Sequence, residues 1–260
     1  MLYSRSYTLQ INMILDLLIK AKRIFRARKL GLSYFRMKNF VLPESIKVDA
    51  KFLSIDLPQF TGINELFRDI ILDDEYFLKT LPNQKINSIA DIGANVGIFA
   101  IAGRIAFPHA EIHCYEPNED NIPYLNRQAE SLGLKTFKEA VSNVDGTCSL
   151  SKSAIHDTSA RITNLEGGQI PLTSLHTVLN RFNSQQIDLL KLDCEGFEFE
   201  ILKDEANLRK CKFITLEYHI VKDQQLESLK NLLSNAGFNV IHANKRNKSL
   251  GNLLAERNGT

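Results

Sequence analysis

The sequence predicts an α/β fold with a mostly parallel central sheet, and three observations support this. From residue 88 onward, short apolar runs alternate with amphipathic helical segments, which is typical of a doubly wound sheet. The first run, Ser88–Ile92, leads into the glycine turn Gly93–Gly97 and then a helical segment. Near the C-terminal end, Asn239–His242 and Asn252–Ala255 have no helix between them, so we expect an antiparallel hairpin to close the sheet.

The remaining elements of this pattern follow in chain order. Further strands are expected at Glu111–Tyr115, Thr136–Val141, Ile187–Leu192 and Phe213–Tyr218. Helices are expected at Gly97–Phe107, Asn121–Leu132, Thr173–Phe182, Phe197–Lys203 and Gln224–Ala236. Residues 142–172 are polar and contain turn signals such as Asp145-Gly146, so we expect this segment to be irregular.

A different pattern precedes this repeat. Apolar residues recur at helical spacing over residues 9–35, with Lys and Arg interleaved, which predicts an amphipathic helix. Apolar and polar residues alternate over residues 46–57, which predicts a strand or hairpin, and Asn64–Tyr76 fits a short helix or helix pair. We therefore expect a basic helical extension over residues 1–45, a strand and helix lead-in over 46–80, and one large domain over 81–260.

The charge of the chain is unevenly spread, although its net value is only +2. Residues 1–51 contain eleven Lys and Arg against three acids, so this part is net +8 and the remainder is net −6. The apolar side of the helix expected over residues 9–35 favours packing on its own domain or on a second subunit. The alternative is a weak contact between this basic helix and an anionic membrane surface. The acidic remainder argues against a nucleic acid partner.

The four cysteines are widely spaced and form no Cys-x-x-Cys pair. We therefore expect reduced, mostly buried thiols, a cytoplasmic location and no zinc site. No run of about 18 apolar residues exists, so no membrane-spanning helix is expected. The apolar stretch Leu9–Ile19 does not fit a signal peptide, because Asp16 interrupts it and no small-residue cleavage site follows.

The turn after the first strand indicates which ligand the sheet edge holds. Gly93 and Gly97 permit a sharp turn and close helix packing, although an ordinary βα turn would also use them. A dinucleotide site needs Gly-x-Gly-x-x-Gly, but Asn95 stands at the second glycine and Asp91 adds a negative charge. Both features fit a ligand with a sulfonium and an ammonium but no phosphate. Glu116, at the end of the second strand, is placed to bind its ribose hydroxyls.

Four segments together resemble the signature blocks of FkbM-type S-adenosylmethionine-dependent methyltransferases. They are Asp91–Gly97, Tyr115–Pro117, Leu190–Gly196 and Leu216–His219, in that order within residues 63–242. The resemblance implies a class I methyltransferase fold, in which helices cover both faces of a Rossmann-like, seven-stranded sheet, with S-adenosyl-L-methionine as cofactor. It also implies, as the usual reaction of the family, O-methylation of a sugar or natural-product hydroxyl. It does not reach residues 1–45, and Ser174-Leu175-His176 stands where the family often has Thr-Leu-Asp.

The resemblance and the turn chemistry together assign the cofactor-binding residues. We expect the cofactor to contact Asp91, Gly93, Asn95, Glu116, Ala140 and Asp193. Ala140 would lie beside the adenine and Asp193 near the methionine part, at the ends of the third and fourth strands. Glu195 and His219 would face the methyl group and the acceptor.

A hydroxyl acceptor is a poor nucleophile at neutral pH, so the reaction gains from a general base. His219 is the first candidate, because its unperturbed pKa is nearest neutrality, and Glu195 is the second. The structural alternatives are a histidine bonded to the backbone and an acid in the first turn of a helix. By ligand type, Asp193, Glu195 and His219 would also suit a metal, but the sequence does not place them together, and we assign no metal.

Substrate contacts are expected from two places. Glu217 shares a face of its strand with His219 and is expected to orient it. His156, Asp157 and Arg161 lie in the polar segment 142–172, and long loops in compact domains are often functional, although a solvated insertion is the alternative.

The leading expectation is therefore an O-methyltransferase acting on a small-molecule or saccharide acceptor, such as a sugar, a glycolipid, a polysaccharide or a natural product. One alternative is RNA methylation. Amino-directed nucleic acid enzymes place Asn/Asp-Pro-Pro-aromatic after the fourth strand, where this chain has Asp193-Cys194-Glu195-Gly196. The other alternative is a non-catalytic cofactor-binding module recruited by its basic N-terminal helix.

Overall fold

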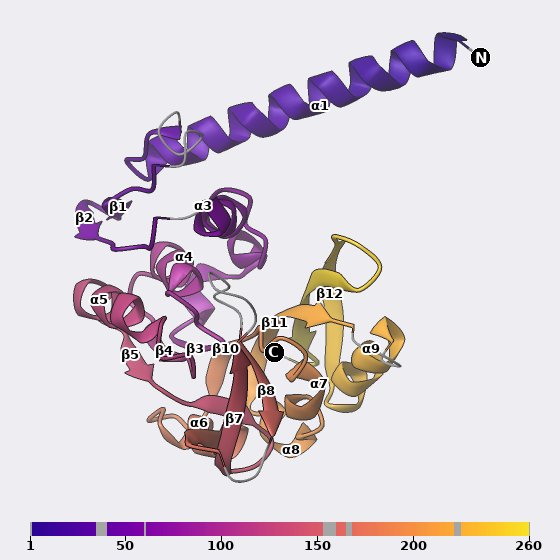
Figure 1. The fold of residues 1–260 in the computed structure, drawn as a ribbon. Coiled ribbons are helices and arrows are strands. Elements are labelled where there is room, and N and C mark those ends of the chain that lie inside the picture. Colours follow the sequence, from indigo (N-terminus) through magenta and orange to yellow (C-terminus); the bar gives the residue numbers. More distant parts are fainter. Residues whose placement is uncertain are drawn as a thin grey trace.

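The computed structural model describes residues 2–34, 41–59, 61–152, 160–164, 168–220 and 225–259. A seven-stranded sheet lies at the centre, in the order β12-β13-β11-β10-β3-β4-β5 (Figure 1). Its strands are β3 (Ser88–Ile92), β4 (Glu111–Tyr115), β5 (Lys135–Phe137), β10 (Ile187–Leu192), β11 (Cys211–His219), β12 (Phe238–Lys245) and β13 (Leu250–Arg257). The first five are parallel, and β13 pairs antiparallel with both β11 and β12. The predicted sheet and its closing hairpin are confirmed.

Helices cover both faces of this sheet. They are α4 (Ile98–Ala106), α5 (Ile122–Leu132), α6 (Leu175–Asn180), α7 (Glu198–Ile201), α8 (Glu205–Leu208) and α9 (Leu226–Asn235). Successive residues of a strand face opposite sides, which divides the core in two. Ile89 packs in one cluster with Phe99 of α4 and Leu125 of α5, whereas Ala90 packs in another with Leu179 of α6 and Leu229 of α9.

The two central strands, β3 and β10, are buried along their whole length, as expected of parallel strands covered on both faces. Their charged residues therefore need partners. At the amino end of β10, Asp188 accepts hydrogen bonds from the backbone N–H groups of Asn87 and Ser88 and pairs with Lys212. Near the carboxyl ends, Asp91 pairs with Lys191.

The prediction of one strand over Thr136–Val141 is wrong, because the structure has two short strands there. β5 ends at Phe137, whose ring stacks on Tyr115 at 4.8 Å in the main sheet. The chain then changes sheets, and β6 (Ala140–Ser142) pairs with β9 (Ile170–Ser174). Between them, Glu139 accepts a hydrogen bond from Thr173 Oγ1 and pairs with Arg181, which holds the chain at this crossing.

The expectation that residues 142–172 are irregular is also wrong. β7 (Gly146–Lys152) and β8 (Ala160–Asn164) join β6 and β9 in a second sheet, in the order β6-β9-β7-β8. This sheet has a small core around Cys148, so its strands lack a continuous apolar alternation in the sequence. The following helix, α6, begins at Leu175 rather than Thr173, because the Ser174 hydroxyl caps it by accepting a hydrogen bond from the Thr177 N–H.

The lead-in segment packs directly on the main sheet. It contains the predicted hairpin, β1 (Ser45–Val48) with β2 (Lys51–Ser54), and then the helix α3 (Thr61–Phe67). A π-helical turn, η1 (Arg68–Leu72), and two 3-10 turns, η2 (Leu78–Thr80) and η3 (Asn83–Lys85), follow. Tyr76 lies between η1 and η2, with its ring edge-on to Phe99 at 5.1 Å. The Thr215 hydroxyl of β11 donates to the Tyr76 carbonyl oxygen. The domain boundary at residue 80 stays a prediction.

The N-terminal helix α1 (Leu2–Lys29) projects from the body and meets it only near its C-terminal end (Figure 1). There Arg23 pairs with Asp73 and Arg26 donates to the Leu72 carbonyl oxygen. In the described part of the chain, no helix combines the length and apolar character needed to cross a bilayer. All four cysteines are free thiols, and Cys114, Cys148 and Cys211 are buried, as predicted.

Candidate active site

The turn between β3 and α4 brings the ends of two strands into contact. The N–H groups of Gly93 and Ala94 both donate to the Tyr115 carbonyl oxygen at 3.0 Å, which fixes the turn to the end of β4. Gly93 has φ +74°, and a Cβ on it would lie 1.8 Å from the backbone oxygen of Asp193. Only glycine therefore allows the turn to approach the end of β10 this closely.

Replacement of Gly93 by alanine is expected to lower the free energy of unfolding by about 3 kcal/mol or more, because backbone strain adds to a backbone overlap. Gly133→Ala is the matched control. Gly133 also has a left-handed φ of +66°, but a Cβ there would meet nothing within 4 Å. That variant should lose only about 1 kcal/mol. Urea denaturation measures both values, and equal losses would contradict the close approach.

Glu116 lies just beyond the end of β4 and is bound from several sides. Its Oε2 accepts the Asn95 N–H at 2.7 Å, and its Oε1 accepts the Asn118 N–H at 2.8 Å and Asn121 Nδ2 at 3.3 Å. Asn95 itself has φ +52°, and its side-chain oxygen accepts the Val96 N–H. Burial raises the pKa of Glu116 to about 7, although these hydrogen bonds oppose the rise.

A cleft of about 490 Å³ adjoins the residues that follow Glu116. It is lined by the loop Pro117–Glu119, by Lys138, and by residues of β7 and β9. Its size falls within the range of small-molecule sites. Ala140 was expected at the end of the third strand, but it begins β6 and is buried with Cys148 and Leu172. That position follows from the break after Phe137.

A buried ion pair lies beneath the glycine turn. Lys191 Nζ is 3.0 Å from Asp91 Oδ1 and donates to the carbonyl oxygens of Gly93 at 2.6 Å and Ile92 at 3.3 Å. Burial lowers the pKa of Lys191, but Asp91 and Asp193 outweigh it, so the net shift is upward. Burial raises the pKa of Asp91, and Lys191 opposes this rise. The lysine thus holds the turn through both its charge and its hydrogen bonds.

A tyrosine from the lead-in joins two carboxyl groups of the site. Tyr76 OH lies 3.0 Å from Asp193 Oδ2 and 3.2 Å from Glu217 Oε2. Burial, with the charges of Asp193 and Glu217, raises the pKa of Tyr76 well above its usual value, so the hydroxyl keeps its proton and donates. On the far side, Arg246 pairs with both Glu217 and Glu75. Strand β11, the residues that follow β10 and β12, and the lead-in thereby converge on one polar cluster.

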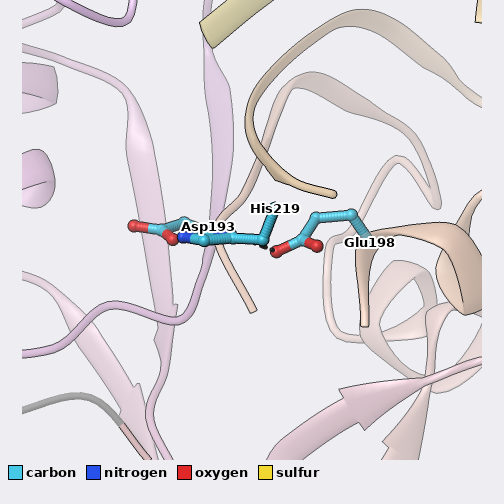
Figure 2. Close-up of side chains that lie close together, drawn as sticks. All are labelled: Asp193, Glu198 and His219. Carbon is cyan, nitrogen blue, oxygen red and sulfur yellow. Dashed lines mark ion pairs between the residues drawn. The ribbon is translucent and has the colours of Figure 1, made fainter. Parts of the chain in front are cut away.

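His219 ends β11 and lies between acidic residues of neighbouring elements. Figure 2 shows its imidazole between Asp193, at the end of β10, and Glu198, in the first turn of α7. Its Nδ1 is 3.5 Å from Glu198 Oε1, its Nε2 is 3.6 Å from Glu195 Oε2, and Glu217 Oε1 lies 4.0 Å from the same nitrogen. The four predicted residues Asp193, Glu195, Glu217 and His219 are thus brought together.

The charges around His219 set its protonation. Burial lowers its pKa, but Glu198, Asp193 and Glu195 outweigh this effect and raise it to about 9. Burial raises the pKa of Glu217 to about 8, with a contribution from the charge of Asp193. The pKa of the His219 imidazole therefore lies above the near-neutral value of an unperturbed histidine.

Three of these groups also have the types and spacing that suit a divalent cation. Asp193, Glu198 and His219 each offer one ligand atom, and these atoms lie within 4.8 Å of one another. The sequence suggested Asp193, Glu195 and His219 as ligands by type, whereas the set with this spacing in the structure contains Glu198 in place of Glu195. Glu198 is fully buried, and its two oxygens accept the N–H groups of Cys194 and Gly196, so it also shapes the turn after β10.

The expected substrate contacts in the polar segment are not brought into this cluster by any described contact. His156 and Asp157 lie outside the described residues. Arg161 lies in β8, opposite Ser151 of β7 in the second sheet.

Several residues of the site were not predicted from the sequence: Glu75, Tyr76, Lys191, Glu198 and Arg246. Lys191 had a signal, because a lone lysine inside an apolar strand must be buried with a partner. Glu198 is one acid among several in its segment, and nothing marks it as buried. Tyr76 and Arg246 come from segments far apart in the chain, so only folding shows that they meet Glu217.

The residues at the carboxyl ends of β3 and β4 fit the predicted cofactor. Glu116 accepts three hydrogen bonds, and because a carboxylate has about four acceptor sites, it can take another from a ribose hydroxyl. Three acids lie around the carboxyl end of β10, the strand beside β3: Asp193, Glu195 and Glu198. Their negative charge suits a ligand that carries a sulfonium and an ammonium. No group in this set resembles a pyrophosphate cradle, since the turn carries Asn95 rather than glycine.

Comparison with known proteins shows the family of this chain. Residues 91–240 match the family described as the methyltransferase FkbM domain. The chain is 26% identical over 191 residues to methyltransferase sdnD of Sordaria araneosa, covering 58% of this chain and 73% of that protein. It is 22% identical over 261 residues to the AMB antimetabolite synthetase AmbE of Pseudomonas aeruginosa, covering 79% of this chain and 12% of that protein. The chain thus spans about an eighth of AmbE.

Solved structures with a similar arrangement include two methyltransferases. The human methyltransferase 10 domain containing protein is 17% identical with a TM-score of 0.47, covering 80% of this chain and 89% of that one. Magnesium protoporphyrin IX methyltransferase of Synechocystis, solved with bound SAM, is 13% identical with a TM-score of 0.43, covering 78% and 86%.

The matched family region runs from Asp91, before the glycine turn, to Val240 in β12, so it contains Glu116, Asp193, Glu195 and His219. The predicted class I fold, the family and the cofactor are all supported. The chain belongs to the FkbM methyltransferase family, and it is an S-adenosylmethionine-dependent methyltransferase.

Proposed function

We propose that this methyltransferase acts on a hydroxyl oxygen of a saccharide, a glycolipid-like molecule or a natural product. The observation that carries the proposal is the cluster at the ends of β10 and β11. There His219 contacts Glu195 at 3.6 Å, with Asp193 and Glu217 beside it. Carboxylates accept hydrogen bonds from hydroxyl groups, and several of them together suit an acceptor with more than one hydroxyl.

The cofactor supplies, when bound, an activated methyl group on a sulfonium. In the proposed arrangement Glu116 accepts hydrogen bonds from the ribose, and Gly93 and Asn95 form the turn beneath it. Asp193, held by the Tyr76 hydroxyl, presents its carboxylate toward the methionine part. Holding the acceptor oxygen in line with the reacting carbon accounts for much of the rate enhancement in such a displacement.

The residues of the cluster accept the acceptor's proton. The side chains of His219 and Glu195 are 15% and 25% exposed, so both can be reached by an acceptor while remaining partly desolvated. A pKa of about 9 keeps most of the His219 imidazole protonated at neutral pH, so the hydroxyl proton passes either to the Glu195 carboxylate or to the neutral fraction of His219. Methyl transfer through His219 therefore becomes faster as the pH rises toward 9. Glu198, which is fully buried behind Nδ1, orients the ring.

A metal role for the same residues gives a different outcome. If His219 and Glu195 act as proton acceptors, dialysis against EDTA should leave the rate unchanged. If Asp193, Glu198 and His219 instead hold a cation, EDTA should abolish turnover and added Mg²⁺ or Mn²⁺ should restore it. Either result is read from methyl transfer with the same acceptor.

The test of the proposed acceptor class is a methyl-transfer assay with a panel of substrates. The panel contains sugars, lipid-linked saccharides, hydroxylated natural products and tRNA. AmbE, the relative named as an antimetabolite synthetase, is the reason to include natural products. Transfer to oxygen in a hydroxylated acceptor supports the proposal. Transfer to tRNA alone would favour an RNA methyltransferase, against which the carboxylates of the cluster already argue, because they repel phosphates. Tight S-adenosylhomocysteine binding with no turnover would favour a cofactor-binding module.

The pKa of Glu116 leads to a prediction for cofactor binding. Its folded-state pKa of about 7 exceeds its ordinary value of 4.5, so its contribution to stability is largest below about pH 4.5 and falls as the pH rises through 7. Ribose hydroxyls donate to the ionised form, so affinity for S-adenosylhomocysteine should change in the opposite direction and rise between pH 5.5 and 8. Glu116→Gln should bind about 10–100-fold more weakly at pH 8 and show little pH dependence.

Isothermal titration calorimetry measures this affinity across the pH range. Glu130→Gln is the control, because Glu130 lies exposed on α5 of the same layer. Equal pH profiles for the wild type and Glu116→Gln would refute the assignment of Glu116 to the ribose.

A further inference from the structure

Helix α1 carries an apolar face that the body does not cover. The exposed fractions of Ile14, Leu18 and Phe25 are 55%, 62% and 60%. Residues at spacings of four and seven lie on the same side of an α-helix, so these three form one stripe, with exposed Ala21 between them. Ala27, two residues beyond Phe25, is fully buried and so marks the opposite side, which packs on the body.

Further apolar side chains widen this surface. Met13, Leu15 and Leu17 are each more than half exposed, and Ile19 is 38% exposed. Large apolar residues in a contiguous exposed patch mark an interaction site in a soluble protein, whereas single ones need no explanation.

The charge of α1 indicates what covers this face. The helix contains seven Lys and Arg and a single acid, Asp16. Arg23 and Arg26 are engaged with Asp73 and Leu72 of the body. Lys20, Lys22, Arg28 and Lys29 remain exposed, and Lys29 Nζ lies 4.6 Å from the centre of the Phe25 ring. Cations therefore lie beside the apolar stripe, as in helices that rest at an anionic lipid–water interface.

A second copy of the chain fits this surface less well. Pairing two such helices along their apolar stripes would bring two sets of exposed cations together, with only one acid per helix to offset them. An anionic bilayer surface instead supplies both a complementary charge and an apolar layer. The arrangement in Figure 1, where α1 extends beyond the body, leaves its outward face accessible to a planar surface.

We propose that α1 binds the surface of anionic membranes through the stripe of Ile14, Leu18 and Phe25 and its neighbouring lysines. The contact is peripheral, since the helix lies along the surface and its cations face the lipid headgroups. It does not depend on which acceptor the active site methylates.

The test is co-sedimentation of the full chain with vesicles of phosphatidylcholine alone and of phosphatidylcholine with one-quarter phosphatidylglycerol. We expect binding to the anionic vesicles only, with a marked loss between 0.1 and 0.5 M NaCl. Lys22→Gln/Lys29→Gln should weaken binding about 25-fold, at roughly fivefold per lysine. Leu18→Ser/Phe25→Ser should weaken it at least about tenfold.

Matched variants on the body separate this surface from a general effect. Val144→Ser/Ile241→Ser removes two exposed apolar side chains, and Lys245→Gln/Lys248→Gln removes two exposed lysines, all of them outside α1. Neither should change vesicle binding, and all four double variants should keep wild-type affinity for S-adenosylhomocysteine, which reports that they are folded. Equal binding to both vesicle types, or no binding to either, would overturn the proposal. A concentration-dependent rise in mass by light scattering, lost in Leu18→Ser/Phe25→Ser, would assign the face to a second copy instead.

Discussion

His219→Ala is expected to lower kcat by about 10²–10⁴-fold, the range that a positioned general acid or base contributes. The reason is its position at the end of β11, where the imidazole contacts Glu195 and Glu198 and faces the same strand edge as Asp193. Cofactor affinity should change by less than about threefold, because Glu116 lies at the end of a different strand. Single-turnover methyl transfer and calorimetry with S-adenosylhomocysteine measure the two effects separately.

Two further variants keep this prediction testable. His219 is largely buried, so its removal could also loosen Glu198, and His219→Gln retains a hydrogen-bonding side chain without a titrating ring. It should lose activity to a similar extent while unfolding at a urea concentration close to that of the wild type. His109→Ala, at an exposed position, is the control and should retain full activity. A loss of less than about threefold in both His219 variants would show that the ring takes no part in the chemistry.

Lys191→Met is expected to lower the free energy of unfolding by about 3–5 kcal/mol, because it would leave Asp91 as an uncompensated buried charge. The side chains of Lys191 and Asp91 are 2% and 0% exposed, so water cannot replace the lost partner. The variant also removes the hydrogen bonds from Nζ to the carbonyl oxygens of Ile92 and Gly93. Cofactor affinity should fall as well, since these bonds support the glycine turn.

A double-mutant cycle isolates the ion pair. Asp91→Asn/Lys191→Met removes both charges and should recover much of the lost stability, because paired neutral replacements of buried ions are often tolerated. Lys203→Met breaks an exposed pair with Glu200 and should cost less than about 1 kcal/mol. The cycle compares the wild type, Asp91→Asn, Lys191→Met and the double variant. Urea denaturation of these four proteins gives the coupling energy between the two side chains, and additive losses of stability would contradict a direct interaction.

The order of the central elements could be predicted because each has a local signature. Largely apolar runs mark the buried strands β3 and β10, and their bounds agree with the predicted Ser88–Ile92 and Ile187–Leu192. The glycine at position 93 is required by a contact with Asp193, yet its position before a helix already marks a tight turn. The closing hairpin was predictable because no helical segment separates its two apolar runs.

The second sheet could not be predicted in this way. β7 and β9 pair across more than twenty intervening residues, and their apolar contribution is a small cluster around Cys148. Polar strands of this kind are specified by their partners rather than by an alternation of their own. The same is true of the strand break at Lys138-Glu139, where Glu139 is held by Thr173 and Arg181 from later in the chain.

For the active site, the sequence by itself determined the residue types at the strand ends: Asp193 and Glu195 after β10, His219 at the end of β11 and Glu116 after β4. Parallel strands place their carboxyl ends at one edge, so the convergence of these residues follows from their positions. Only the tertiary structure decided their protonation and support. Burial raises the pKa of Glu116, the surrounding carboxylates raise that of His219, and Tyr76, Lys191 and Arg246 supply hydrogen bonds from distant segments. Such effects depend on distances and exclusion of water, which a linear sequence does not contain.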